Sequence, residues 1–272
     1  MEKPPAPGPL QSPATWSATA PGYAEEVVPH MARYAERALQ LVPVSRTDRV
    51  LDVATGPGSL AFVAAARCAH VHAVDFSPGM ISALRERAAR QSVSNLEASE
   101  MDAQALSFPE GSFDATFCMF GYMFFPDRAL AFREMLRVLR PGGRALIATW
   151  SPIDRRPFMK LGFDAMAEAL PQLPAPAKGD LQSADDCVAE MSAAGFRHVT
   201  CQPFSAAARV DSPEHYLRIM ARSGAPFVML KKKLGDEAWA QAEACMLSAL
   251  RRSIPAGGME LGAEALLSIG ER

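Results

Sequence analysis

The stretch that most constrains the fold is RVLDVATGPGSLA, residues 49–61. A short apolar run leads into a turn that contains Gly56 and Gly58, and an Ala-rich apolar run follows. This pattern predicts a strand, a tight turn and the start of a helix. Glycine lets the backbone turn sharply and lets a ligand approach closely. The helix would point its free N–H groups and positive dipole end into the turn, so we expect a ligand cradle here.

The cradle alone does not identify its ligand, because Gly56-x-Gly58-x-x-Ala61 also fits the G-x-G-x-x-A form of the dinucleotide fingerprint. Asp52 argues against NAD(P): a dinucleotide needs no carboxylate inside the strand, whereas a ligand with an ammonium group would use one. Asp75 ends a second apolar run about 20 residues beyond the glycines, where an acidic residue can bind ribose hydroxyls. Together these features favour a cofactor that contains a nucleoside.

Strands alternate with helices over about 100 residues, which predicts a doubly wound parallel α/β sheet with helices on both faces. Ligands bind such sheets at the carboxyl ends of the strands. An antiparallel edge strand is expected at 259–269. The other expected strands are residues 49–53, 70–74, 95–98, 113–119, 145–150 and 196–204.

The proline-rich residues 1–14 are expected to be a disordered leader. Residues 15–272 are expected to form a single domain. Within it, 49–150 would be the cofactor-binding core, and 151–195 and 205–258 would be the cap on the substrate side.

Composition excludes several classes of partner. The chain has 28 Lys and Arg, 30 Asp and Glu, and a net charge of -2, which gives no reason to expect a nucleic acid. Its five cysteines form no C-x-x-C pair, so we expect free thiols in a reducing compartment and no metal site. No apolar run reaches about 18 residues, so no membrane span is expected. These features predict a cytoplasmic protein; whether it is a monomer or a homodimer stays open. A proline-rich loop at 171–178 is expected to be a lid or a surface linker.

Four motifs, in order, resemble those of class I S-adenosylmethionine-dependent methyltransferases, in the ubiquinone/menaquinone-biosynthesis (type 11) branch. The resemblance is close over 49–150 and holds only in outline elsewhere. It implies a mostly parallel, seven-stranded Rossmann-like sheet with a helical cap formed by C-terminal insertions. Dinucleotide folds lack the last of the four motifs. The motifs are residues 50–58, 74–80, 102–103 and 139–143, the last of which contains Pro141-Gly142-Gly143.

The resemblance also implies which residues would bind S-adenosylmethionine and its product S-adenosylhomocysteine. Asp52 would lie near the amino group of the methionine moiety, Asp75 would bind the ribose hydroxyls, and Asp102 would accept from the adenine amino group. Tyr23 would either close over the ligand or serve as a packing anchor. The turn, the adenine neighbours and the residue near the sulfonium complete the set: Ala54, Gly56, Gly58, Phe76, Met80, Ala103 and Phe120. The chain departs from the family pattern at Ala54 and Met101, where glycine is usual or frequent.

No general base can be assigned from the sequence. His215, Tyr122 and His30 are weak candidates, and each has an equally good structural explanation. Aromatic and methionine side chains near the ligand edge and in the cap favour an apolar acceptor pocket. We therefore expect in-line methyl transfer to a small apolar metabolite, by O- or C-methylation of an aromatic, polyketide-like or quinone-like compound. The alternative is a protein of the same fold that binds the cofactor without methylating; a dinucleotide oxidoreductase ranks third.

Overall fold

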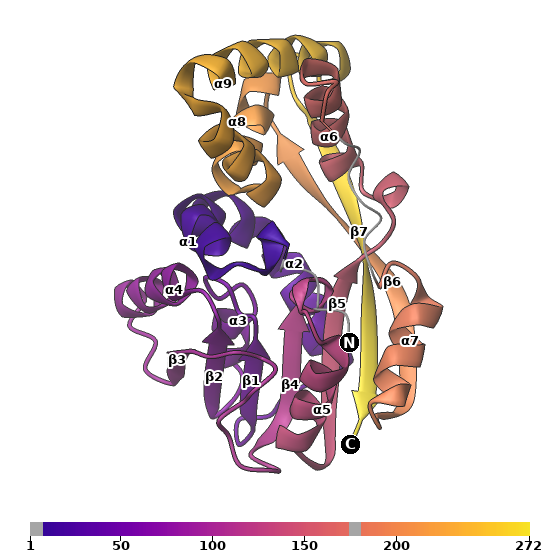
Figure 1. The fold of residues 1–272 in the computed structure, drawn as a ribbon. Helices are drawn as coiled ribbons and strands as arrows, with labels where there is room; N and C mark the ends of the chain where they lie inside the picture. The colour runs from indigo at the N-terminus through magenta and orange to yellow at the C-terminus, as the bar shows by residue number, and fades with distance from the viewer. Residues whose placement is uncertain (1–7, 174–180) are drawn as a thin grey trace, which may run out of the picture.

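The computed structural model describes residues 8–173 and 181–272, and a seven-stranded mixed sheet runs through its centre (Figure 1). The strand order is β3-β2-β1-β4-β5-β7-β6. β1 to β5 are parallel, and β7 is antiparallel to both of its neighbours. The strands are β1 Arg49–Val53, β2 His70–Asp75, β3 Leu96–Glu100, β4 Phe113–Met119, β5 Leu139–Trp150, β6 Arg197–Val210 and β7 Met259–Glu271. The expected doubly wound α/β fold is confirmed.

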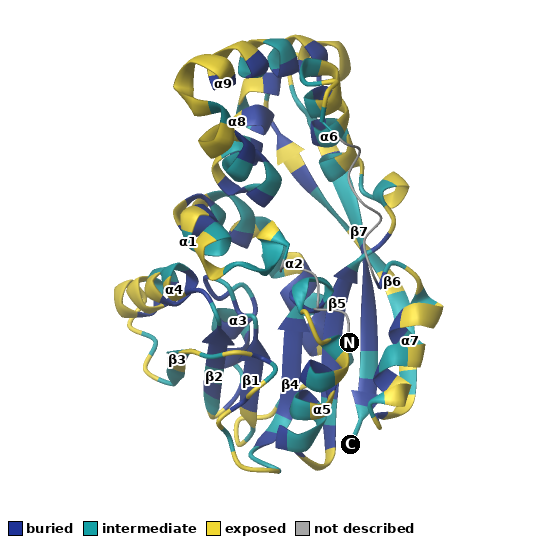
Figure 2. Cartoon of the chain, in the orientation of Figure 1, coloured by how far each residue is buried: buried dark blue, intermediate teal, exposed yellow. Residues whose placement is uncertain are grey.

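Helices cover both faces of the sheet. One face packs against α2, α3 and α4, and the other against α5 and α7, because alternate residues of the buried strands point to opposite sides. The central strands are buried along most of their length (Figure 2), as their nearly continuous apolar sequences require. The helices are α1 Pro13–Gly22, α2 Val28–Leu41, α3 Ala61–Ala65, α4 Pro78–Arg90, α5 Arg128–Val138, α6 Pro157–Ala169, α7 Ala184–Ala193, α8 Pro213–Ser223 and α9 Ala225–Ser253.

A cap stands on an extension of the sheet. Past the last β5 pair, Trp150 with Ala265, β6 and β7 continue as a two-stranded ribbon that reaches the pair Val210 and Met259. This ribbon carries α6, α8 and α9 (Figure 1), which share an apolar core of their own. None of the helices within the described ranges is long and apolar enough to cross a membrane.

Two expectations about the second half are wrong. β7 is an inner strand between β5 and β6, and β6 forms the edge. Leu266 and Leu267 of β7 are buried on opposite faces, which suits an inner position. The assignment of 151–195 to the cap fails for α7, because Cys187 and Met191 pack into the core of the sheet.

The expected disorder of 1–14 is also wrong for the described part of that segment. Residues Pro9–Gln11 form a 3-10 turn and α1 begins at Pro13, while residues 1–7 lie outside the described ranges. Both prolines stand at the first helical position, where a missing N–H group is of no consequence. Trp16 Nε1 donates to the carbonyl of Leu10 at 2.8 Å and fixes this entry to α1. The expected loop at 171–178 falls mostly on residues 174–180, which are not described.

The N-terminal helices lie between the core and the cap (Figure 1). α1 packs against α4 on one side and against α8 and α9 on the other. A π-helical turn, Tyr23–Val27, then leads into α2. Gly22 lies so close to α8 that a Cβ there would stand 2.1 Å from the carbonyl oxygen of Arg222.

Candidate functional site

The glycine turn forms at the carboxyl end of β1, next to the point where the strand order reverses between β1 and β4. Ala54, Gly56 and Gly58 have φ values of +52°, +56° and +89°. The left-handed conformation is natural for the two glycines but strained for Ala54. The turn is held by Thr55, whose N–H donates to the carbonyl of Val74 at 3.0 Å. The backbone therefore turns sharply at the carboxyl end of β1, as the sequence predicted.

Asp75 ties this turn to the end of β2. Its Oδ2 accepts from the N–H of Gly56 at 2.9 Å, and its Oδ1 accepts from the N–H of Ser77 at 2.9 Å. Ser77 in turn caps α4 by accepting from Met80 N. A carboxylate has about four acceptor positions, so Asp75 keeps acceptor capacity for a ligand.

Asp52 and Asp75 are two buried carboxyl groups at neighbouring strand ends. Asp52 is 1% exposed and Asp75 is 6% exposed. Oδ2 of Asp52 accepts from the hydroxyl of Thr55 at 2.7 Å, while its Oδ1 has no partner. Burial raises the pKa of Asp52 to about 7 and that of Asp75 to about 6. Within the described ranges no basic side chain pairs with either group, and such uncompensated negative charge favours a cationic ligand.

The structure brings the third strand end to the same place. The N–H of Met101 donates to the carbonyl of Asp75 at 2.9 Å. Asp102 beside it is exposed, and its Oδ1 accepts from Gln104 N at 2.8 Å. Ala103 is buried. Asp102 is thus available at the position expected for it.

Phe76 and Met80 differ in their access to a ligand. Phe76 is half-buried, whereas Met80 is buried, with its sulfur 4.0 Å from where a Cβ on Gly56 would stand. Met80 therefore packs against the glycine turn.

Phe120 follows β4, on the other side of the switch point from Asp52. Its ring is buried, stacks on Trp150 at 4.0 Å and meets the edge of Tyr34 at 5.4 Å. Its φ of +65° is strained for a phenylalanine. The next residue, Gly121, lies against the turn, because a Cβ there would be 2.4 Å from that of Ala54. The backbone of β4 thus reaches the cradle, while the ring belongs to an aromatic cluster.

Ser17 of α1 is a site neighbour that the sequence reasoning missed. Its hydroxyl lies 2.9 Å from that of Ser77 and accepts from Gly79 N at 3.2 Å. The sequence reasoning placed no helix at residue 17, although Pro13 is a recognisable helix start. Tyr23 lies close enough to Asp75 that the carboxylate charge, after burial, contributes to raising the pKa of the phenol to about 12. The N-terminal helices therefore border the cradle.

The catalytic candidates lie elsewhere. Tyr122 is 0% exposed, packs on Phe132 at 4.1 Å and directs its hydroxyl to the sulfur of Met135. This arrangement agrees with a packing role for Tyr122. His215 stands in the first turn of α8 in the cap, where its Nδ1 accepts from Asp211 N at 3.0 Å. His30 is on α2, and its pKa is lowered by burial first and then by the charge of His215.

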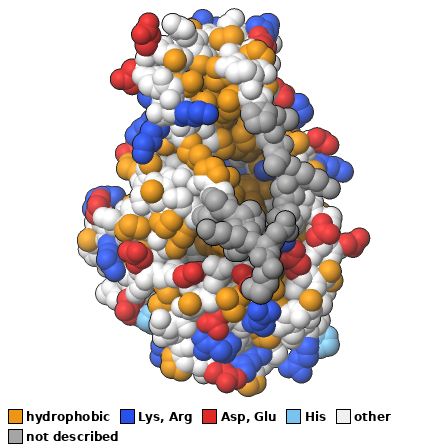
Figure 3. Space-filling view, viewed as in Figure 1, with side chains coloured by type: hydrophobic (Ala, Val, Ile, Leu, Met, Phe, Trp, Pro, Cys, Tyr) orange, Lys and Arg blue, Asp and Glu red, His pale blue; other side chains and the backbone are white. Residues whose placement is uncertain are grey.

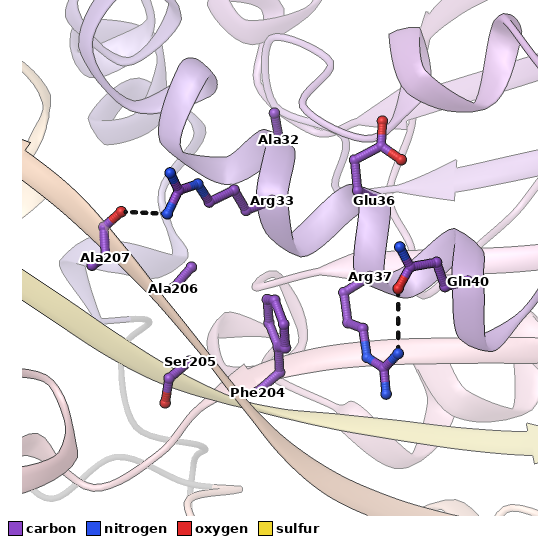
Figure 4. Close-up of a pocket in the computed structure, with 9 residues that line it drawn as sticks. All are labelled: Ala32, Arg33, Glu36, Arg37, Gln40, Phe204, Ser205, Ala206 and Ala207. Atoms are coloured by element: carbon purple, nitrogen blue, oxygen red, sulfur yellow. Dashed lines mark hydrogen bonds between the residues drawn. The ribbon is translucent and has the colours of Figure 1, made fainter.

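Hollows also lie outside the cradle. A groove of about 450 Å³ separates α2 from the edge strand β6 (Figure 4). Its Arg33 donates to the carbonyl of Ala207, and its Arg37 donates to Gln40, so both guanidinium groups are already bonded. A second hollow, between the cap and the core, shows hydrophobic side chains in its depth (Figure 3).

Comparison with known proteins identifies the core. Residues 50–143 match the family model described as a methyltransferase domain. The segment 50–143 is therefore similar to a methyltransferase domain. It contains the glycine turn, Asp75, Asp102 and the Pro141-Gly142-Gly143 motif, which lies in β5 between the paired residues Leu139 and Arg144. This segment is about a third of the chain and does not include the cap.

Curated relatives that are named methyltransferases match slightly less than half of the chain. A demethylmenaquinone methyltransferase of Thermus thermophilus is 38% identical over 128 residues, which cover 46% of this chain and 58% of that protein. A ubiquinone/menaquinone biosynthesis C-methyltransferase, UbiE, of Geobacter sulfurreducens is 35% identical over 133 residues, 47% of this chain and 52% of that protein. The chain thus spans little more than half the length of these relatives.

The fold extends over the whole described chain. The crystal structure of the [4+2]-cyclase SpnF superposes with a TM-score of 0.60 at 18% identity, covering 98% of this chain and 97% of that one. At this identity the likeness shows a common fold over both the core and the cap.

Proposed function

We propose that the protein is an S-adenosylmethionine-dependent methyltransferase that acts on a small apolar acceptor. The observation that carries the proposal is the pair of buried carboxyl groups, Asp52 and Asp75, beside the glycine turn of a methyltransferase domain. S-adenosylmethionine bears a sulfonium and an ammonium group, so it would supply the positive charge that the described residues leave out.

The residues present fit this cofactor. The unpartnered Oδ1 of Asp52 would accept from the ammonium group, and the remaining acceptor capacity of Asp75 would take the ribose hydroxyls. Asp102 and the backbone of Ala103 would bind the adenine edge. When bound, the cofactor supplies a methyl group on a positively charged sulfur that leaves as a neutral thioether. The protein mainly has to align the acceptor and keep water out.

The acceptor would lie between the cradle and the cap. Phe120 and Trp150 form a stacked pair at the ends of β4 and β5, and the cap has its own apolar core. The hollow between the cap and the core, which has hydrophobic side chains at its bottom, lies in this region (Figure 3). The Thermus relative is named for demethylmenaquinone. These points favour a flat aromatic or quinone-like acceptor, methylated at oxygen or carbon.

The alternative is a protein that binds the cofactor without methylating. One structural neighbour is named as a [4+2]-cyclase, but at 18% identity it shows only the fold. No residue of the cradle favours this alternative, because Asp52, Asp75 and both turn glycines are intact.

The test is incubation of the chain with methyl-labelled S-adenosylmethionine and a panel of phenols and quinone precursors. We expect label in at least one acceptor, and its loss in Asp75→Asn but not in the exposed control His198→Gln. Tight cofactor binding with no transfer to any acceptor would support the non-methylating alternative instead.

A further inference from the structure

β2 and the edge strand β3 bring three metal-ligating side chains together, toward the amino end of β2 and away from the cradle. His70 and His72 are alternate residues of β2, so both project from the same face. In the parallel register His72 stands opposite Glu97 of β3. Two imidazoles and one carboxylate therefore converge on one patch.

The ligand atoms are close to one another. Nε2 of His70 lies 3.7 Å from Oε2 of Glu97, and Nδ1 of His72 lies 3.6 Å from the same oxygen. One ligand atom from each residue falls within 4.8 Å of the other two. Around a tetrahedral ion with bonds of about 2.0–2.1 Å, neighbouring ligands are separated by about 3.4 Å. Small side-chain rotations would close the difference, and the Glu97 side chain, 59% exposed, is free to make them.

We propose that His70, His72 and Glu97 form a binding site for a divalent transition-metal ion such as Zn²⁺. The proposal does not depend on the proposed methyltransferase activity. Imidazole suits zinc, copper and nickel, and two histidines with one carboxylate leave at least one coordination position for water. Mg²⁺ and Ca²⁺ require mainly oxygen ligands, so the site should reject them.

The surroundings orient the two imidazoles. The ring of Phe108 packs edge-on against His72 at 5.3 Å, and that of Phe113 does so at 5.6 Å. The two histidine rings are themselves 4.5 Å apart.

The positive charge of Arg49 lies near this site and disfavours the binding of a cation. Arg49 of β1, which pairs with His70 in the sheet, contributes to lowering the pKa of His72. The carboxylate of Glu97 acts in the opposite direction and lies within ion-pair distance of both rings. A bound ion would therefore depend on Glu97 for charge as well as for coordination. It would also link the edge strand β3 to β2.

The test is a calorimetric titration of the untagged full chain with ZnCl₂ and, separately, with MgCl₂. We expect one Zn²⁺ per chain and no Mg²⁺ binding. His72→Gln and Glu97→Gln should each weaken Zn²⁺ binding at least tenfold, whereas His198→Gln, an exposed histidine on β6, should leave it unchanged. Glu97→Gln keeps the measurement decisive if His72→Gln fails to fold, because Glu97 is at the surface.

Thiols are the competing zinc ligands, since Cys187 and Cys201 are free. Co²⁺ distinguishes the two sites: thiolate ligands give an intense near-ultraviolet charge-transfer band, and imidazole and carboxylate ligands do not. The proposal predicts a Co²⁺ complex without that band, lost in Glu97→Gln. Absence of Zn²⁺ binding, binding unchanged in both ligand variants, or a thiolate band lost in Cys187→Ser would each overturn it.

Discussion

Asp52 links the site to the stability of the protein. Burial raises its pKa to about 7, so the folded protein holds a proton that the unfolded chain releases near pH 4. Between about pH 4 and pH 7, the folded protein therefore binds more protons at Asp52 than the unfolded chain does. The free energy of unfolding should therefore fall as pH rises from about 4 to about 7, by up to roughly 4 kcal/mol.

Asp52→Asn should remove the share of the slope that Asp52 contributes, while Asp75, whose pKa is also raised, keeps its own share. The asparagine oxygen can still accept from Thr55, and the variant has no charge to bury, so it should be more stable than the wild type at pH 8. Urea unfolding at pH 5 and pH 8 measures the difference, with the exposed Asp211→Asn as the control. Equal slopes in Asp52→Asn and the wild type would show that this carboxyl group is not the source.

The sequence predicted the positions of some site residues but not of others. Asp52, Asp75 and the glycines were predictable because a fixed motif sets their positions on strand ends. Tyr122 was not, since an aromatic run does not reveal which face each ring takes. The left-handed turn at Phe120 and the 3-10 turn Tyr122–Phe124 send Tyr122 into the core under α5.

At the scale of elements, α1 docks on the first turn of α4 through a contact that admits no side chain. A Cβ on Gly79 would stand 2.7 Å from the Cα of Ser17. Gly79→Ala should push α1 away and cost about 1–3 kcal/mol, although alanine is the better helix former. Urea unfolding and amide exchange over 13–22 measure the loss.

Gly257→Ala is the matched control for that substitution. Gly257 is exposed in the turn before β7, and a Cβ there would meet nothing within 4 Å. Its effect should stay within about 0.5 kcal/mol. Equal effects of the two substitutions, or unchanged exchange in α1 of Gly79→Ala, would contradict the docking account.

Most element types were predictable, but their partners were not. The alternation of strands and helices predicted β1 to β5 because each has a clear apolar period. The place of β7 between β5 and β6 depends on pairing over long sequence separations, which periodicity does not encode. Gly235, with φ +75°, breaks α9 into two helical parts.

At the scale of the whole molecule, the N-terminal helices join the core to the cap. Arg222 of α8 bonds to Glu25 and Glu26 of the π-helical turn, but these partly exposed ion pairs contribute under about 1 kcal/mol each. The close packing of Gly22 on α8 and of Gly79 on α1 holds the three parts together. The sequence suggested a cap, but could not show that the β6–β7 ribbon carries it.

The central claim is that the cradle binds S-adenosylmethionine through Asp75. Calorimetric titration with S-adenosylhomocysteine tests it most directly, because this product lacks the methyl group and cannot react. We predict one site per chain, at least tenfold weaker binding in Asp75→Asn through lost hydrogen bonds to a charged acceptor, unchanged binding in Gly257→Ala, and no binding of NADH. Equal affinity in the wild type and Asp75→Asn, or binding of NADH in place of S-adenosylhomocysteine, would contradict the account.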